Sequence, residues 1–86
     1  MRTSRQYEID RALLRALVQT GSYLAQRPAL FAVARLHVVG APATETELIE
    51  SFANHDTAGR LTSVQGETGA KYRLNDTGRA WAAENL

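Results

Sequence analysis

The sequence predicts a single α+β domain, mostly α-helical, that spans residues 1–86. Three observations predict it. Helix-start signatures stand at Thr3 and Thr44, two short strand-like runs flank a glycine-containing tip after residue 60, and Asn75 precedes another helical segment. A chain of this length has room for one domain. The expected order is three helices, a β-hairpin and a C-terminal helix.

The composition favours a soluble, cytoplasmic protein. No stretch approaches the roughly 18 consecutive apolar residues that a membrane span requires. The basic start at residues 1–5 runs into a polar amphipathic segment rather than the apolar core of a signal peptide. The absence of cysteine excludes disulfides and thiolate metal sites, which fits a reducing compartment. We therefore expect no membrane partner.

The formal net charge of +1 is unevenly distributed. Residues 1–43 hold six arginines against two acids, a net charge of +4, whereas residues 44–86 hold four basic residues against seven acids, a net charge of −3. A nucleic-acid-binding surface on such a chain therefore has to be confined to a local basic region.

The first helix is expected to begin with a capping box formed by Thr3 and Gln6 and to stop at Gly21. Its apolar residues recur at three- and four-residue steps, which gives a wide face for the core. They are Tyr7, Ile9, Leu13, Leu14, Leu17 and Val18.

Two arginines, Arg11 and Arg15, lie one turn apart on the polar side of this helix, and Glu8 is close enough in sequence to pair with Arg11. Two interpretations stay open. The arginines form a solvated helix face, or they contact phosphates.

The second helix is expected from Pro28, which suits a first helical turn, to about Val39. Its apolar residues cover nearly the whole circumference, so either other helices wrap it or it presents apolar surface to a partner. They are Leu30, Phe31, Val33, Leu36, Val38 and Val39. We interpret His37 as a partly buried, hydrogen-bonded side chain.

Residues 40–43 are expected to separate the second helix from the third, and Gly40 can adopt the left-handed conformation that ends a helix. Thr44 and Glu47 predict a second capping box. The residues expected to face the core are Leu48, Phe52 and Ala53. The outward positions of the first two turns are then Glu45, Thr46, Ile49 and Glu50.

The hairpin has strands at 61–65 and 70–74 around the tip 66–69, whose glycines can supply positive φ angles. Tyr72 and Leu74 alternate with basic residues and should point inward. Leu61 and Val64 do not share a parity, so the first strand is expected to bulge or to begin late. Asn75 then caps a helix from Asp76 to about Asn85.

The run Tyr72-x-Leu74-x-x-x-Gly78-Arg79 resembles the junction between wing and last helix in winged helix-turn-helix domains of small bacterial and phage regulators. In that pattern the helix after Thr44 is the recognition helix, the hairpin is the wing, and residues 22–25 form a minor strand that pairs with it. The resemblance implies binding to double-stranded DNA and transcription regulation, commonly by a homodimer.

The resemblance also assigns candidate site residues. The candidate DNA contacts, on the recognition helix and the wing, are Thr46, Glu50, Ser51, Asn54, Arg60, Lys71 and Arg73. The candidate dimer interface, on the first and last helices, is Leu13, Leu17, Trp81 and Leu86. Trp81 has an intramolecular core role as its alternative. His55 and Arg60 depart from the family pattern, which has leucines there. If His55 faces the core, it should be half-buried and titrate near neutral pH.

The charge of the recognition helix conflicts with the usual form of DNA binding. Base readers are typically Arg, Lys, Asn or Gln, whereas this helix begins with three glutamates, and no Lys or Arg stands between Arg35 and Arg60. A second function therefore stays open. The domain can be a protein–protein interaction module that uses its acidic third helix against a basic partner or its apolar second helix for assembly.

Catalysis is not expected. The chain has no cysteine nucleophile, and its two histidines, His37 and His55, fall on different expected elements. Glu47, Glu50 and His55 form a poor metal-ligand set because they lack the spacing of known sites. We expect no enzymatic activity, no cofactor and no metal.

Overall fold

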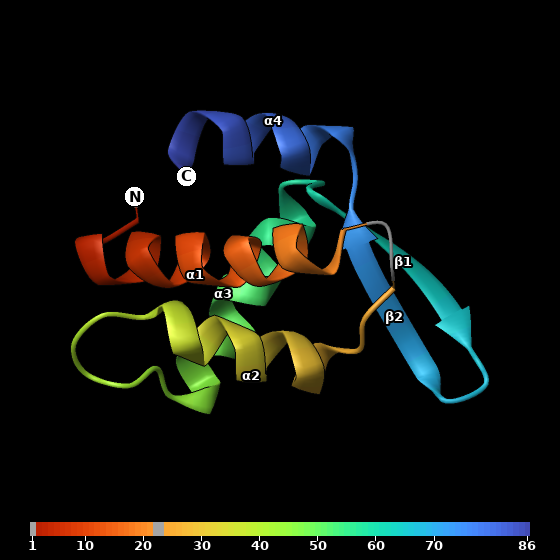
Figure 1. Ribbon diagram of the computed structural model, residues 1–86, viewed down its shortest axis with the longest axis horizontal. Helices are drawn as coiled ribbons and strands as arrows, with labels where there is room; N and C mark the ends of the chain where they lie inside the picture. The colour runs from red at the N-terminus through yellow and green to blue at the C-terminus, as the bar shows by residue number, and fades with distance from the viewer. Residues whose placement is uncertain (1, 22–23) are drawn as a thin grey trace.

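The computed structural model describes residues 2–21 and 24–86, which form four helices and one two-stranded antiparallel sheet (Figure 1). In chain order the elements are α1 (Ser4–Thr20), α2 (Arg27–His37), α3 (Glu45–Thr57), β1 (Leu61–Gly66), β2 (Gly69–Leu74) and α4 (Asp76–Asn85). The mostly helical α+β class and the predicted order of elements are confirmed. Within the described residues, no helix has the length and apolar character needed to cross a membrane.

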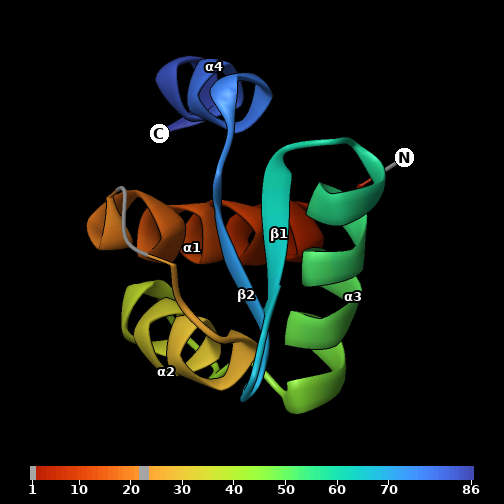
Figure 2. The same cartoon turned by 90° about the vertical axis from the view of Figure 1, so that its right-hand side faces the viewer.

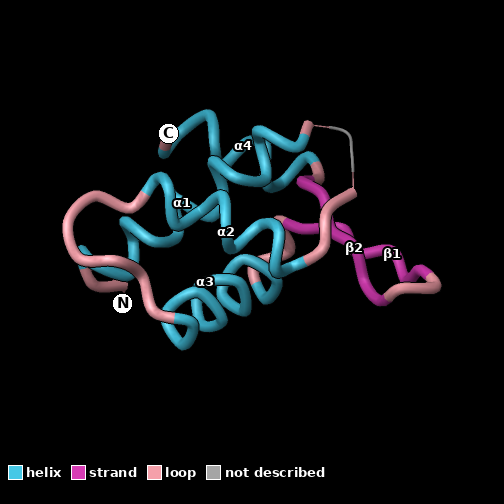
Figure 3. The backbone as a smooth tube through the Cα atoms, turned by 60° about the horizontal axis from the view of Figure 1, so that its bottom comes forward, coloured by secondary structure: helices cyan, strands magenta, loops and turns pink. Residues whose placement is uncertain are grey.

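Helix α1 lies at the centre of the molecule. In Figure 1 it runs between α4 on one side and α2 on the other, with α3 crossing behind it. Figure 2 looks onto the hairpin, which stands across one end of α1 with α3 beside it. Figure 3 shows the tip of the hairpin projecting beyond the helices. Because α1 is covered from several sides, it contributes the largest share of the core, and Leu13, Leu14 and Leu17 are fully buried.

The helix starts form as the sequence predicts. Thr3 and Gln6 close a capping box at α1, and Thr44 and Glu47 close a second one at α3. At α4 the Asn75 side chain accepts a hydrogen bond from the Gly78 backbone N–H at 2.9 Å. Each cap satisfies N–H groups that a helix start leaves unpaired, which is why these starts can be predicted from short patterns.

Helix α2 ends at His37, two residues earlier than predicted, because Val38 is already extended (φ −84°, ψ 123°). Its inner face buries Leu30, Phe31 and Ala34. Leu36, in its last turn, is 83% exposed, and Val39 just beyond is 81% exposed. Both alternatives predicted for this apolar helix are therefore present. One face packs in the core, and the C-terminal end presents exposed apolar side chains.

The chain before α2 pairs with the hairpin, as the winged-helix pattern implies. Ala25 and Tyr72 exchange both backbone hydrogen bonds, at 3.0 and 2.8 Å, in an isolated antiparallel bridge. Residues 22 and 23, which complete the predicted minor strand, lie outside the described residues. The Tyr72 ring then packs edge-on against Phe52 of α3, with ring centroids 4.7 Å apart. These contacts hold the hairpin against both α2 and α3.

The hairpin is regular from Leu61 opposite Leu74 to Gly66 opposite Gly69. The prediction of a bulge or late start in the first strand is wrong. It assumed that Leu61 and Val64 both point inward, whereas Val64 is 45% exposed and lies on the outer face. At the tip, only Gly69 adopts a positive φ (+113°).

The position of Gly78 explains why the Tyr72–Arg79 motif contains a glycine. It is buried in the first turn of α4, where a Cβ atom would lie 2.3 Å from the Arg60 carbonyl oxygen and 2.6 Å from Leu74 Cδ2. The same carbonyl accepts the Asn75 backbone N–H at 3.3 Å. Only a residue without a side chain allows α4 to approach the start of β1 this closely.

Candidate nucleic-acid interface

The outward face of α3 is the predicted one. Glu45, Thr46, Ile49 and Glu50 are all exposed. The inward face differs from the prediction, because Ala53 is exposed while Ser51 and His55 are fully buried. The buried stripe is Leu48, Ser51, Phe52 and His55. The prediction of Ala53 as a core residue is wrong, Ser51 is buried instead of exposed, and His55 faces the core, which the sequence left open.

The polar residues of this stripe are buried because Asp10 of α1 provides their partners. Asp10 is 1% exposed, and its carboxylate accepts the Ser51 hydroxyl at 2.6 Å, two bonds from the Arg2 guanidinium at 2.6 and 2.9 Å, and a long one from the Asn54 amide at 3.4 Å. The prediction of Ser51 as a DNA contact is therefore wrong, since its hydroxyl is enclosed and already engaged. Asn54 is half-buried and turned towards the same carboxylate.

His55 is held in one neutral tautomer. A guanidinium can only donate, so Arg60, whose Nη1 lies 3.1 Å from Nδ1 of His55, makes that nitrogen an acceptor. The Nε2–H group then donates to the Asp10 carbonyl oxygen at 2.9 Å. Burial lowers the pKa of His55, so the expectation of a half-buried histidine that titrates near neutral pH is wrong.

The Arg60 guanidinium also lies 4.6 Å from the centroid of the Trp81 ring, in cation–π geometry. Its side chain is thus directed to the junction of α3 and α4 instead of the outer surface of the hairpin. The predicted role of Arg60 as a wing contact to DNA is not supported by this position. A polar contact between His55 and Arg60 occupies the place where the winged-helix pattern has two leucines.

The three glutamates at the start of α3 are each paired with an arginine from elsewhere in the chain. Arg35 of α2 binds Glu45 at 2.6 Å, Arg5 of α1 binds Glu47 at 3.0 Å, and Arg2 binds Glu50 in addition to Asp10. The hydrogen bond from Arg5, with the Thr44 N–H as the second cause, lowers the pKa of Glu47 to about 2. The inference that this surface lacks basic residues is wrong, because it considered only residues adjacent in sequence.

The second hairpin strand presents two basic residues on its outer face. Tyr72 and Leu74 point inward as predicted, so Lys71 and Arg73 alternate to the other side, opposite Val64 and Thr62 of β1. Arg73 is exposed and Lys71 half-buried. No ion pair involves either residue within the described part of the chain. Together with the exposed Thr46 of α3, these two residues are the site predictions that the geometry leaves available for a nucleic acid.

Another basic residue near the hairpin is Arg27, at the start of α2, which lies on the side of Tyr72. Its guanidinium lies 5.7 Å from the Phe52 ring centroid, and it lines a hollow of about 360 Å³ together with Tyr72 and the hairpin tip. The Gln26 amide donates to the Thr68 carbonyl oxygen at 2.9 Å across this hollow. No local pattern predicts a role for Arg27, because its proximity to β2 depends on how the chain packs before α2.

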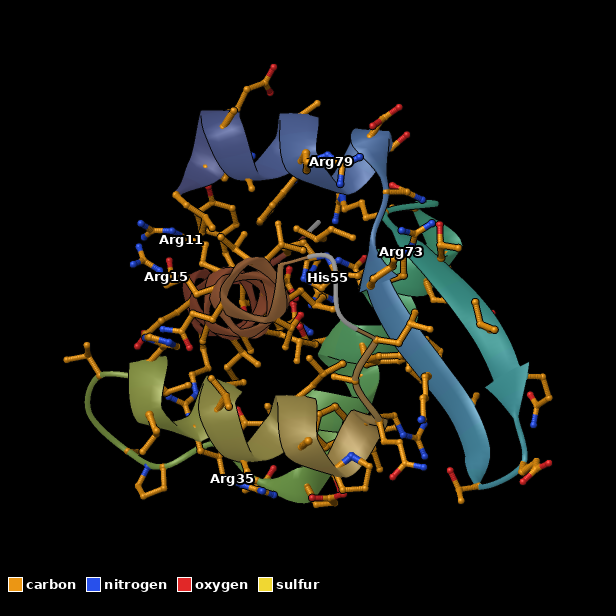
Figure 4. All side chains as sticks on the ribbon, turned by 45° about the vertical axis from the view of Figure 1, so that its right-hand side comes forward. Arg11, Arg15, Arg35, His55, Arg73 and Arg79 are labelled. Atoms are coloured by element: carbon orange, nitrogen blue, oxygen red, sulfur yellow. The ribbon has the colours of Figure 1, made fainter. Side chains whose placement is uncertain are left out.

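Arg11 and Arg15 lie on the other side of the molecule. Figure 4 shows both projecting from α1 on the side opposite Arg73. Arg11 donates to the Asn85 carbonyl oxygen at 2.8 Å, and the predicted pairing with Glu8 is replaced, because Glu8 accepts the Val39 backbone N–H at 3.0 Å. The hairpin and these two arginines therefore do not lie on the same surface of the molecule.

Part of the predicted dimer interface is buried in the core of the same chain. Leu13 and Leu17 are 0% exposed, so their assignment to a dimer interface is wrong. Trp81 is half-buried between Tyr7, with ring centroids 6.0 Å apart, and His55 at 5.4 Å, which supports its intramolecular alternative. Leu86 is 40% exposed.

No protein-family model matches the chain, and no curated protein matches it. The geometry of the hairpin and of α3 is therefore what separates the candidate functions.

Proposed function

We propose that this protein is a small winged-helix DNA-binding protein, a cytoplasmic transcription regulator, in which β1 and β2 form the wing and α3 is the recognition helix. One observation carries the proposal. Lys71 and Arg73 stand on the outer face of β2 and form no ion pair within the described residues. Phosphate contacts by Lys and Arg supply most of the affinity of such proteins for duplex DNA.

The pairing of the α3 glutamates supports the same function. Three unpaired carboxylates would repel a phosphate backbone, but each of these accepts a guanidinium. In the first two turns of the helix, the exposed neutral residues are then Thr46 and Ile49, whose methyl groups suit apolar contact with a thymine methyl in the major groove. In this proposal the wing supplies affinity, and α3 supplies shape and a small number of neutral contacts.

Affinity for duplex DNA measured by gel shift against salt concentration tests the proposal. Each phosphate contact contributes about 0.9 to the slope of log K against log salt. Replacing Lys71 and Arg73 together with Ala should weaken binding and reduce that slope by roughly 2. Replacing Gln19 of α1 and Ala83 of α4, which are exposed and lie outside the hairpin, with Glu lowers the net charge by the same amount. This matched control should leave the slope unchanged.

Two results would contradict the proposal. The first is the absence of any shift at low salt with a folded protein. The second is an equal loss of binding in the wing variant and in the charge-matched control, because that would make the effect one of overall charge.

A second function, recognition of a protein partner, is favoured by the exposure of Leu36 and Val39, which are 83% and 81% exposed. The version of this function in which the acidic α3 binds a basic partner is less well supported, because the α3 carboxylates are already paired with arginines. If no DNA binding is found, replacing Leu36 and Val39 with Gln in an interaction assay tests the apolar form of this function.

A further inference from the structure

We infer that a cleft beside α1, on the side opposite the hairpin, binds a small organic anion with a carboxylate or phosphate head and an apolar body. The cleft has a volume of about 490 Å³ and lies between α1 and the end of α2. This volume falls within the range of small-molecule sites, about 300–1,000 Å³. The inference does not depend on DNA binding, because none of the proposed DNA contacts lines the cleft.

Arg11 and Arg15 provide the charge that an anionic head requires. They stand four residues apart and therefore share one face of α1, and Figure 4 shows both directed to the same side. The ion pairs of the described residues involve other arginines, namely Arg2, Arg5, Arg35 and Arg79. Two neighbouring guanidinium groups without a counter-charge repel each other, and a bound anion removes that repulsion.

The hydrogen-bonding capacity of Arg11 is only partly used. A guanidinium carries five N–H donors, and the Nε–H group of Arg11 donates to the Asn85 carbonyl oxygen at 2.8 Å. That bond fixes the position of the group against the end of α4 and leaves its terminal nitrogens for a ligand. Arginine is well suited to such a head, because its planar fork matches a carboxylate or phosphate in two parallel bonds.

His37 provides a second and independent observation. Its Nε2 atom is enclosed and has no hydrogen-bond partner among the described residues. Enclosed polar side-chain atoms are nearly always paired in folded proteins, so an exception needs an explanation. His37 lines this cleft and also an adjoining hollow of about 270 Å³, which it shares with Arg15 and Leu86. Because the His37 ring lines the cleft, a rotation that exposes its Nε2–H group would let it donate to a ligand head between Arg15 and His37.

The rest of the cleft favours a small anion with an apolar body. Tyr7, Ala12 and Val39 supply the apolar wall, and Val39 is 81% exposed. Glu8 is the one acid in the lining, and its carboxylate accepts the Val39 N–H at 3.0 Å. Because Glu8 offsets one of the two arginines, the cleft has a net charge of about +1, which complements a small anion with a single anionic head.

Nuclear magnetic resonance titration of the uniformly ¹⁵N-labelled chain with four probes tests this inference. Benzoate and phenyl phosphate carry the two candidate heads on one apolar body, benzamide is the neutral analogue, and inorganic phosphate lacks the body. Saturable chemical-shift changes at Tyr7, Arg15 and His37 are expected with benzoate or phenyl phosphate. The probe that binds more tightly identifies the anionic head that the cleft prefers. Benzamide should bind at least about tenfold more weakly, because it lacks the charge.

Replacing Arg15 with Gln should weaken the better probe about tenfold, as the loss of one charge-assisted bond predicts. Arg35→Gln is the matched control, since it removes an arginine that is paired with Glu45 outside the cleft. The same spectra report whether each variant is folded. The inference is overturned if no organic anion gives saturable shifts up to about 10 mM. It is also overturned if benzamide or inorganic phosphate binds equally well, or if both variants lose affinity equally.

Discussion

Replacing Gly78 with Ala tests the close contact between α4 and the start of β1. The new Cβ atom would lie 2.3 Å from the Arg60 carbonyl oxygen and 2.6 Å from Leu74 Cδ2. The first of these atoms belongs to the backbone and is held by the Asn75 N–H at 3.3 Å. It cannot rotate away as the end of a flexible side chain can, so α4 has to move outward.

Two opposing effects set the size of the change. Alanine is favoured over glycine inside a helix by about 1 kcal/mol. An inserted methyl group in a closely packed site costs about 1–3 kcal/mol, and the contact with a fixed carbonyl oxygen places this site at the upper end. We therefore expect Gly78→Ala to reduce the free energy of unfolding by about 2 kcal/mol. For a domain of this size, that corresponds to a decrease in Tm of roughly 10 °C.

Urea unfolding followed by circular dichroism measures this difference. The control is Ala80→Gly, at an exposed position of the same helix, which isolates the helix-propensity effect and should cost about 1 kcal/mol. If Gly78→Ala leaves stability unchanged or increases it, the close approach of α4 to Arg60 does not exist, and the explanation given for the glycine of the Tyr72–Arg79 motif is refuted.

Three further predictions concern the buried polar groups and the exposed end of α2. Asp10→Asn should lower the free energy of unfolding in urea by about 3 kcal/mol, because it leaves the Arg2 guanidinium without its buried counter-charge. Burial lowers the pKa of His55, so the unfolded chain binds a proton more readily than the folded one. Stability should therefore be constant above pH 6.5 and fall as pH decreases below it, and His55→Gln should flatten this part of a Tm-against-pH profile. Leu36→Gln should change the unfolding free energy by less than about 0.5 kcal/mol, whereas a larger loss would show that Leu36 packs against the domain.

The secondary structure could be predicted because its signals are local. Both capping boxes and the Asn75 cap join residues three apart, and the breaks at Gly21, Gly40 and Gly59 coincide with positive φ angles. A sequence displays such patterns directly. The errors in element bounds were small, such as the end of α2, where extended Val38 replaces the last predicted turn.

The candidate site was harder to predict because its determinants are distant in sequence. Ser51 and His55 are buried only because Asp10, 41 and 45 residues earlier, supplies their hydrogen-bond partners. An apolar-periodicity argument places the polar Ser51 on the surface, and it leaves open whether His55 faces the core. The charge of α3 was misjudged for the same reason, since Arg2 and Arg5 reach Glu50 and Glu47 across more than 40 residues of chain.

Trp81 is the only tryptophan in the chain, and its surroundings make it an intrinsic optical reporter. Its ring is contacted by the Arg60 guanidinium at 4.6 Å, the His55 ring at 5.4 Å and the Tyr7 ring at 6.0 Å, so three separate segments meet at one fluorophore. A charged group against an indole changes its emission, and separating α4 from α1 and α3 would expose the ring to water. Fluorescence of the unlabelled protein should therefore follow the docking of the C-terminal helix separately from the loss of helical signal.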